Sequence, residues 1–157
     1  MTKLALRLGQ ATLAIVVVSG LAGSVLGQEK AISAKSVPSA VINAFKSSYP
    51  DATIKGFARE KENGKVFYEI ESKEGAVGRD VLYNPDGSVA EIEETIAVSE
   101  LPDAIRESIK SKYPKAVITK AEKTIQGEKV GYEVIARQGR KRISVEFDAD
   151  GNVKTKQ

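Results

Sequence analysis

The stretch VPSAVINAFKSSYPDATI, residues 37–54, returns 64 residues later as LPDAIRESIKSKYPKAVI, residues 101–118. The two copies keep one register without a gap, so that residues 37–91 align onto 101–155. Identical pairs run through the whole alignment, from Pro38 and Pro102 near its start to Val89 and Val153 near its end. A register of this length indicates a tandem duplication, and the fold must therefore be built from one unit used twice.

Each copy begins with a predicted amphipathic helix. Apolar residues recur at every fourth position, which places them on one stripe of a helix: Val37, Val41, Phe45 and Tyr49, then Leu101, Ile105, Ile109 and Tyr113. Pro50 and Pro114 disfavour helical geometry at the tyrosine before them and end each helix there. Because Tyr49 and Tyr113 lie on the apolar stripe, we interpret them as core residues and not as a ligand-stacking pair.

Four predicted strands follow each helix, because apolar and polar residues alternate between turn sequences rich in Gly, Asn and Asp. The predicted strands lie at 52–59, 66–71, 78–83 and 88–94, and at 116–123, 130–135, 142–147 and 152–156. The predicted fold is α+β, with two tandem α-β-β-β-β repeats and one helix per repeat packed on one face of an antiparallel sheet. The expected boundaries are a polar lead-in at 28–35, repeat 1 at 36–94, a joint at 95–99 and repeat 2 at 100–157.

Residues 1–27 have the three parts of a secretory signal, which are a basic start, an apolar core and small residues before a cleavage point after Gly27. We expect a periplasmic or secreted protein with no stable membrane insertion after cleavage. The sequence has no Cys, His or Trp, which excludes disulfides, thiol nucleophiles and imidazole bases. Without Lys3 and Arg7, the 24 basic residues fall to 22 against 21 acidic ones. This balance, with export, argues against a nucleic-acid partner.

The repeated YPxA after each helix, the YEI and YEV strands and the YNPDG and FDADG turns resemble the PepSY-like family of exported bacterial proteins, which is grouped with the β-lactamase-inhibitor-like fold. The resemblance spans residues 37–156. It implies tandem repeats that form a curved sheet, whose open face grips an enzyme in the best-known member. That inhibitor has disulfides, and its contact motif has no match in this sequence, so the resemblance assigns no contact residue here.

Two surfaces are candidate binding sites. Alternation places apolar and acidic side chains on the sheet face away from the helices, as expected of a protein-binding face or of an ordinary solvated sheet: Phe67, Glu69, Glu71, Leu82, Glu133 and Ile135. A basic cluster, present only in the second copy, is either a docking point for an anionic partner or a solvated hairpin tip: Arg137, Arg140, Lys141 and Arg142.

No catalytic residue, metal site or cofactor is predicted. Glu69 and Glu133 match across the copies, but a symmetric pair beside basic residues is more typical of cross-strand ion pairs than of catalysis. Asp148–Asn152 resembles the start of a calcium loop, yet its Gly is fourth instead of sixth, and we interpret it as a hairpin turn. Glu91, Glu93 and Glu94 are interpreted as solvated.

The sequence favours a non-catalytic protein-binding module, with enzyme inhibition as one form of it; the alternative is an envelope sensor or surface-docking protein.

Overall fold

The computed structural model describes residues 29–62 and 64–154. The predicted signal at 1–27, its cleavage point and the end of the last predicted strand lie outside these residues. The described chain forms these elements: β1 (Lys30–Ala31), α1 (Ser39–Ser48), β2 (Thr53–Glu62), β3 (Lys65–Glu74), β4 (Val77–Tyr83), β5 (Val89–Ile96), α2 (Asp103–Lys112), β6 (Val117–Gln126), β7 (Lys129–Gln138) and β8 (Lys141–Asp148).

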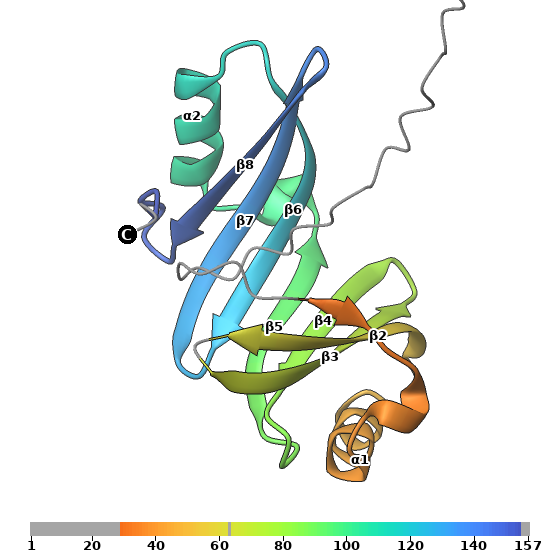
Figure 1. Cartoon of the computed structure of the whole chain (residues 1–157). Helices are drawn as coiled ribbons and strands as arrows, with labels where there is room; N and C mark the ends of the chain where they lie inside the picture. Colours follow the sequence, from red (N-terminus) through yellow and green to blue (C-terminus); the bar gives the residue numbers. More distant parts are fainter. Residues whose placement is uncertain (1–28, 63, 155–157) are drawn as a thin grey trace, which may run out of the picture.

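All eight strands form one antiparallel sheet whose spatial order is the order of the sequence, β1 to β8 (Figure 1). The predicted α+β class and the tandem repeats are confirmed. The second repeat differs from the expectation at its end, where Val153 forms only an isolated bridge with Phe147 and no extended strand. The eighth strand of the sheet is instead the short β1, which pairs with β2 ahead of the first repeat.

The duplication is visible in backbone detail. The two helices begin and end at positions 64 residues apart, and each is closed by its tyrosine with φ of −133°. The Tyr49 amide donates to the Phe45 carbonyl at 2.8 Å, and the Tyr113 amide donates to the Ile109 carbonyl at the same distance. An irregularity in register also recurs, between Ile54 and Gly56 in β2 and between Ile118 and Lys120 in β6.

Both helices cover the same face of the sheet. The central pairing of β5 with β6 sets Ile92 opposite Ile125 and keeps one face continuous across the two repeats. In repeat 1, Val41 and Phe45 of α1 pack with Ile70 and the strands beside it. In repeat 2 the corresponding cluster contains Ile105, Ile109, Val134, Val145 and Phe147. Each repeat therefore has its own core on the helix side of a shared sheet.

A turn that contains a glycine follows β4 and another follows β8, and each turn packs against the helix of its own repeat. Gly87 and Gly151 have φ of 88° and 85°, a backbone conformation that L side chains rarely adopt. A Cβ at Gly87 would lie 2.8 Å from the Ala40 carbonyl oxygen, and one at Gly151 would lie 3.1 Å from the Ala104 Cβ. The glycine of the repeated Asp-Gly sequence is therefore needed for a tight turn that lies in contact with the helix. Within residues 29–62 and 64–154, no helix is long and apolar enough to span a membrane.

Candidate functional site

The open face is the side of the sheet that carries neither helix. Side chains alternate between the two faces along each strand, so the pairing of the strands defines its members. In register, Glu69 of β3 lies opposite Leu82 of β4, Asp80 lies opposite Glu93 of β5, and Glu122 of β6 lies opposite Glu133 of β7. The central part of the open face is rich in carboxylates: Glu60, Glu69, Glu71, Asp80, Glu91, Glu93, Glu122, Glu133 and Glu146.

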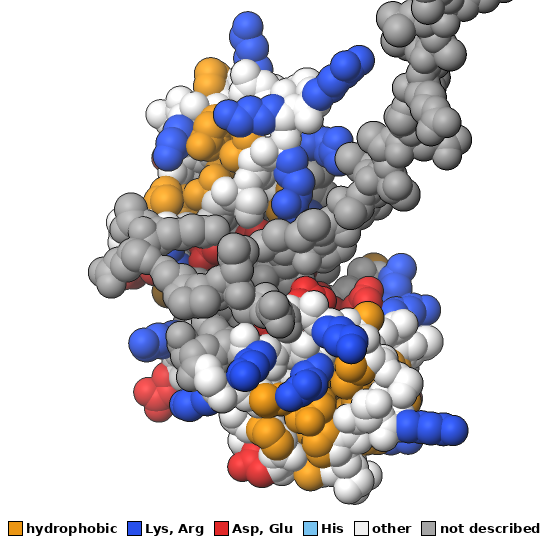
Figure 2. All heavy atoms as spheres, in the orientation of Figure 1, with side chains coloured by type: hydrophobic (Ala, Val, Ile, Leu, Met, Phe, Trp, Pro, Cys, Tyr) orange, Lys and Arg blue, Asp and Glu red, His pale blue; other side chains and the backbone are white. Residues whose placement is uncertain are grey.

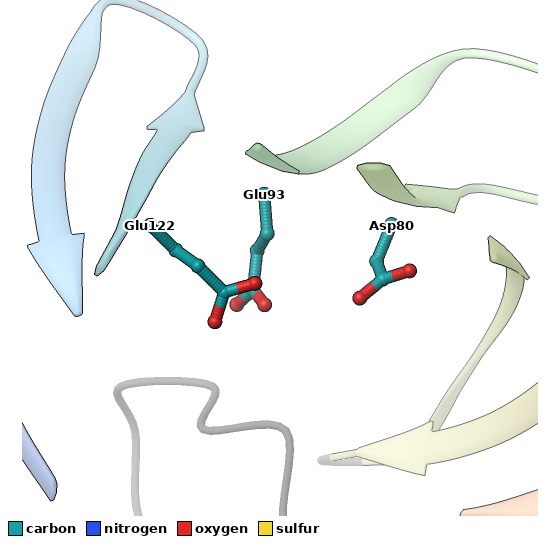
Figure 3. Close-up of side chains that lie close together, drawn as sticks. All are labelled: Asp80, Glu93 and Glu122. Atoms are coloured by element: carbon teal, nitrogen blue, oxygen red, sulfur yellow. The ribbon is translucent and has the colours of Figure 1, made fainter. Parts of the chain in front are cut away.

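Three of these carboxylates converge where the two repeats meet. Asp80 of β4, Glu93 of β5 and Glu122 of β6 place one carboxylate oxygen each within 4.8 Å of the others. Figure 3 shows the Glu93 and Glu122 carboxylates close together, with Asp80 beside them from the neighbouring strand. We call these three residues the carboxylate triad. Among the described residues, it is the group of acidic side chains whose arrangement could hold a metal ion.

Several carboxylates in and around the triad have hydrogen-bond or ion-pair partners. The Lys120 ammonium lies 2.6 Å from Glu122 Oε1. The Gln126 side-chain amide donates to Glu91 at 2.8 Å. The Ser144 hydroxyl donates to Glu133 at 2.6 Å. Such partners compensate for the burial of charged groups, since an unpaired buried charge is costly.

The concentration of carboxylates changes their acidity. Burial, followed by the charges of neighbouring glutamates, raises the pKa of Glu93 to about 9. Burial also raises the pKa of Asp80 to about 6, although the nearby Lys120 acts in the opposite direction. Burial and the charges of Asp80, Glu29 and Glu60 raise the pKa of Glu69 to about 8. At the centre of the open face, burial and mutual repulsion destabilise the ionised carboxylates, and a nearby cation would stabilise them.

The Lys120 ammonium remains a cation in this setting. Burial alone would lower its pKa, but the hydrogen bond and charge of Glu122, together with the charges of Asp80 and Glu133, raise it. Lys120 therefore balances one of the negative charges of the triad.

The structure places the predicted apolar anchors on the open face, with one correction. Phe67 and Ile135 are half-buried on that face. Leu82 was expected to be exposed, which is wrong, because only 7% of it is exposed. It belongs to neither helix-side core and lies opposite Glu69 and Glu91. Of the three predicted apolar anchors, Phe67 and Ile135 are therefore the partly accessible ones.

The predicted acidic residues differ in accessibility. Glu71 is exposed and Glu69 is half-buried. Glu133 was expected to face solvent like Glu69, which is wrong, because it is 5% exposed and held by Ser144.

The acidic residues at the end of repeat 1 were expected to be solvated, and this is also wrong. Glu91 and Glu93 are buried on the open face, while Glu94 points to the helix side. Glu94 accepts a hydrogen bond from the Arg79 Nε at 2.6 Å, and the Arg79 guanidinium stacks 4.1 Å from the centre of the Tyr49 ring.

Glu122 was not singled out in the sequence at all. Alternation along 116–123 could have placed it on the open face, but only the β5–β6 register brings it to Asp80 and Glu93.

The basic cluster lies at the β7–β8 hairpin. Arg137, Arg140, Lys141 and Arg142 are all exposed, and Arg137 lies directly opposite Arg142. None of the four forms an ion pair with another described residue. Figure 2 shows Lys and Arg side chains projecting from this end of the molecule. The open face is thus acidic at its centre and basic at one end.

The turn at Asp148 behaves as the sequence predicts. The Asp148 carboxylate accepts hydrogen bonds from the backbone amides of Asp150 and Asn152 at 3.0 and 2.8 Å. It also accepts one from the Asn152 side-chain amide at 3.0 Å. These bonds close the hairpin turn, so the carboxylate stabilises local backbone.

The fold and the sequence both match known proteins. The model of a family described as "Putative beta-lactamase-inhibitor-like, PepSY-like" matches the chain twice, over residues 24–90 and 68–155. The chain therefore belongs to this PepSY-like family, as its repeated motifs indicated. Among curated proteins, nothing matches the chain significantly.

Solved structures share the fold at low sequence identity. A "putative periplasmic" protein of Bacteroides eggerthii has a TM-score of 0.63 at 17% identity, with 77% of this chain and 88% of that chain covered. A DUF2874 family protein of Bacteroides uniformis has a TM-score of 0.61 at 14% identity, covering 76% and 87%. A BLIP-like protein of Bacteroides fragilis has a TM-score of 0.57 at 22% identity, covering 76% and 85%. At these low sequence identities, the similarity to the solved structures establishes a shared fold and not a shared function.

Proposed function

We propose that this protein is an exported, non-catalytic module that binds another protein through the open face of its sheet. One observation carries the proposal: both helices pack on the same face of one continuous sheet, which leaves the other face without a helix. A sheet face that presents partly exposed apolar side chains among charged ones has the composition of a protein-binding surface. Phe67 and Ile135, from different repeats, would contribute apolar contacts on either side of the acidic centre.

Several observations support export and a non-catalytic role. The first 27 residues have the pattern of a secretory signal. The Bacteroides eggerthii relative is described as periplasmic. The sequence supplies no Cys or His to act as nucleophile or base. The family description includes the words "beta-lactamase-inhibitor-like", which supports enzyme inhibition as the specific form of binding, with an exported enzyme as the target.

A pull-down experiment tests this function. The protein produced from the full sequence is used as bait for envelope extract, and the double variant Phe67→Ala with Ile135→Ala is compared with it. We expect the variant to keep its circular dichroism spectrum and to lose a specifically captured protein. The matched control is Val98→Ala with Val153→Ala, which truncates exposed apolar residues outside the sheet strands and should leave capture intact. Equal capture by both double variants would contradict the proposal.

A second function is favoured by the basic hairpin. Its four exposed cations have no counterpart in the first copy, where the matching stretch is KEGAVG, residues 73–78, so the fold does not need them. They would dock the protein on an anionic surface such as a lipid head group or wall polymer. Phosphatidylglycerol vesicles should then bind the protein at low salt and release it at high salt. Arg140→Gln with Arg142→Gln should weaken this binding; unchanged binding would exclude the hairpin.

A further inference from the structure

The strand β8 lies at the edge of the sheet (Figure 1), and most of its outer side has no neighbour in the described part of the chain. After the turn that follows β8, Val153 forms a single bridge with Phe147. No described residue pairs with the outer side of residues 141–145. An unpaired strand edge presents backbone N–H and C=O groups with which another chain can pair.

One hydrogen bond shows which backbone groups of β8 point outward. The Lys154 amide donates to the Glu146 carbonyl at 2.9 Å from outside the sheet, so the backbone groups of Glu146 point away from β7. Alternate residues of a strand direct these groups to the same side, and β8 pairs with β7 without a register shift. The N–H and C=O groups of Arg142 and Ser144 therefore also point outward.

Repeat 1 shows what the fold places beside this edge. β8 matches β4 at the offset of 64 residues, and β4 is paired with β5 from Tyr83 to Arg79. The bridge between Phe147 and Val153 repeats the first of these pairs, that of Tyr83 with Val89. Repeat 2 therefore has the start of a counterpart to β5, and no described strand continues it along β8.

On the helix side, an added strand would meet apolar residues. Ile143 and Val145 of β8 belong to the core of repeat 2. In repeat 1, Val81 matches Val145, and Ile92 of β5 lies opposite it and packs against the core. An apolar residue beside Val145 would extend the second core in the same way.

On the open face, the charges of the edge favour an acidic partner. Arg137 of β7 and Arg142 of β8 lie directly opposite each other, where like charges repel. Both are exposed, and neither forms an ion pair with another described residue. In repeat 1 an arginine of β4 is paired across strands, since Arg79 Nε donates to Glu94 of β5 at 2.6 Å. An acidic residue beside Arg142 would relieve its repulsion with Arg137.

A second copy of the chain fits this edge less well. Two antiparallel β8 strands centred on Ser144 would place Arg142 opposite Glu146 of the second copy, but Lys154 already lies on the outer side of Glu146. Centring the pair on Arg142 would bring two arginines face to face. Charged residues on edge strands commonly prevent such self-pairing.

We propose that the outer edge of β8 binds an extended segment of another protein in which acidic and apolar residues alternate. The segment pairs antiparallel with β8 through the outward backbone groups of Arg142 and Ser144, which is recognition by strand addition. Its acidic side chains lie beside Arg142, and its apolar side chains lie beside Ile143 and Val145. This contact at the sheet edge does not depend on the proposed contact through Phe67.

The probe is a short synthetic peptide of alternating valine and glutamate, blocked at both ends and titrated into the protein produced from the full sequence. NMR should show saturable binding and slower hydrogen exchange at the amides of Arg142 and Ser144, because these N–H groups gain acceptors. A peptide of alternating valine and lysine should not bind. The glutamate peptide with a central proline should bind more weakly, because proline has no N–H to donate.

Two variants separate charge from backbone pairing. Arg142→Gln should weaken binding of the glutamate peptide about two- to fivefold, as expected for one cross-strand charge pair. Ser144→Pro should weaken it at least about fivefold, because it removes an outward N–H and leaves the β7–β8 hydrogen bonds in place. The matched control is Lys110→Gln, an exposed cation on α2, which should bind like the unaltered protein. If Ser144→Pro fails to fold, the proline-containing peptide still tests the backbone pairing.

The proposal is overturned if the glutamate peptide does not bind at up to about 1 mM, if the lysine peptide binds equally well, or if Arg142→Gln binds as tightly as Lys110→Gln. Protection of the same amides by self-association without peptide would assign the edge to a second copy and overturn it too. Binding to phosphatidylglycerol vesicles but not to the peptide would leave docking by charge alone. Since the titration involves no envelope protein, its failure would leave the proposed open-face function standing.

Discussion

The two faces of the sheet show what the duplication kept and what it changed. On the helix side the copies agree closely: the helices have matching bounds, the tyrosines close them with the same hydrogen bond, and buried apolar residues recur in place. On the open face Glu69 and Glu133 still match, but other positions differ, with Asp80 against Ser144, Glu122 against Ala58 and Lys120 against Gly56. The helix face therefore specifies the fold, and the open face is the surface on which function can differ.

The first prediction concerns the helix face and carries the largest effect. Phe45 and Ile109 occupy matching positions in the two cores. Phe45→Ala should lower the free energy of unfolding by about 3–5 kcal/mol and Ile109→Ala by about 2–5 kcal/mol, because each leaves a cavity. Urea unfolding measures both. The matched controls, Lys46→Ala and Lys110→Ala, alter exposed residues of the same helices and should change it by less than about 0.5 kcal/mol. A loss below about 1 kcal/mol in only one repeat would break the equivalence of the cores.

The second prediction concerns the pH dependence of the open face. The pKa of Glu69 is raised from 4.5 to about 8 by burial and by Asp80, Glu29 and Glu60. Between these two values the folded protein holds a proton that the unfolded chain has lost, so stability falls as pH rises from about 4.5 to about 8. Glu69→Gln should remove the contribution of this carboxyl group to the loss of stability between about pH 4.5 and pH 8.

Unfolding in urea at several pH values measures the effect. The variant should match the unaltered protein near pH 4.5 and exceed it by about 1 kcal/mol at pH 8. Glu107→Gln, on the outer side of α2, should leave the pH profile unchanged. A Glu69→Gln variant that is less stable at pH 8 would show that the carboxylate is stabilising, contrary to the charge crowding described.

The third and smallest effect is expected at the basic hairpin. Arg140 and Arg142 are exposed and form no ion pair with other described residues. Arg140→Gln with Arg142→Gln should change the free energy of unfolding by less than about 0.5 kcal/mol. Thermal melts at low and high salt measure this. A larger loss would mean that the hairpin charges contribute to the fold, as the helix face does.

The sequence predicts the helix face better than the open face for a physical reason. The helix stripe and the Tyr-Pro stop are local patterns, and the duplication repeats them, so the helices and most strands of each repeat could be predicted, whereas β1 and the single sheet shared by both repeats could not. Glu93 and Glu122 are 29 positions apart in the sequence, and they meet only through the pairing of β5 with β6 across an intervening helix. Local alternation gives the face of each side chain but not this register, so the triad and the burial of Leu82 and Glu133 could not be foreseen.

The assignment of function to the open face is tested most directly by site-specific crosslinking in cells. A photo-reactive amino acid is placed at position 67 or 135 on the open face, or at position 107 on the outer side of α2. We predict that positions 67 and 135 give the same discrete covalent adduct with another protein and that position 107 gives none. An adduct from position 107 with none from 67 and 135 would place the binding surface on the helices and contradict the account.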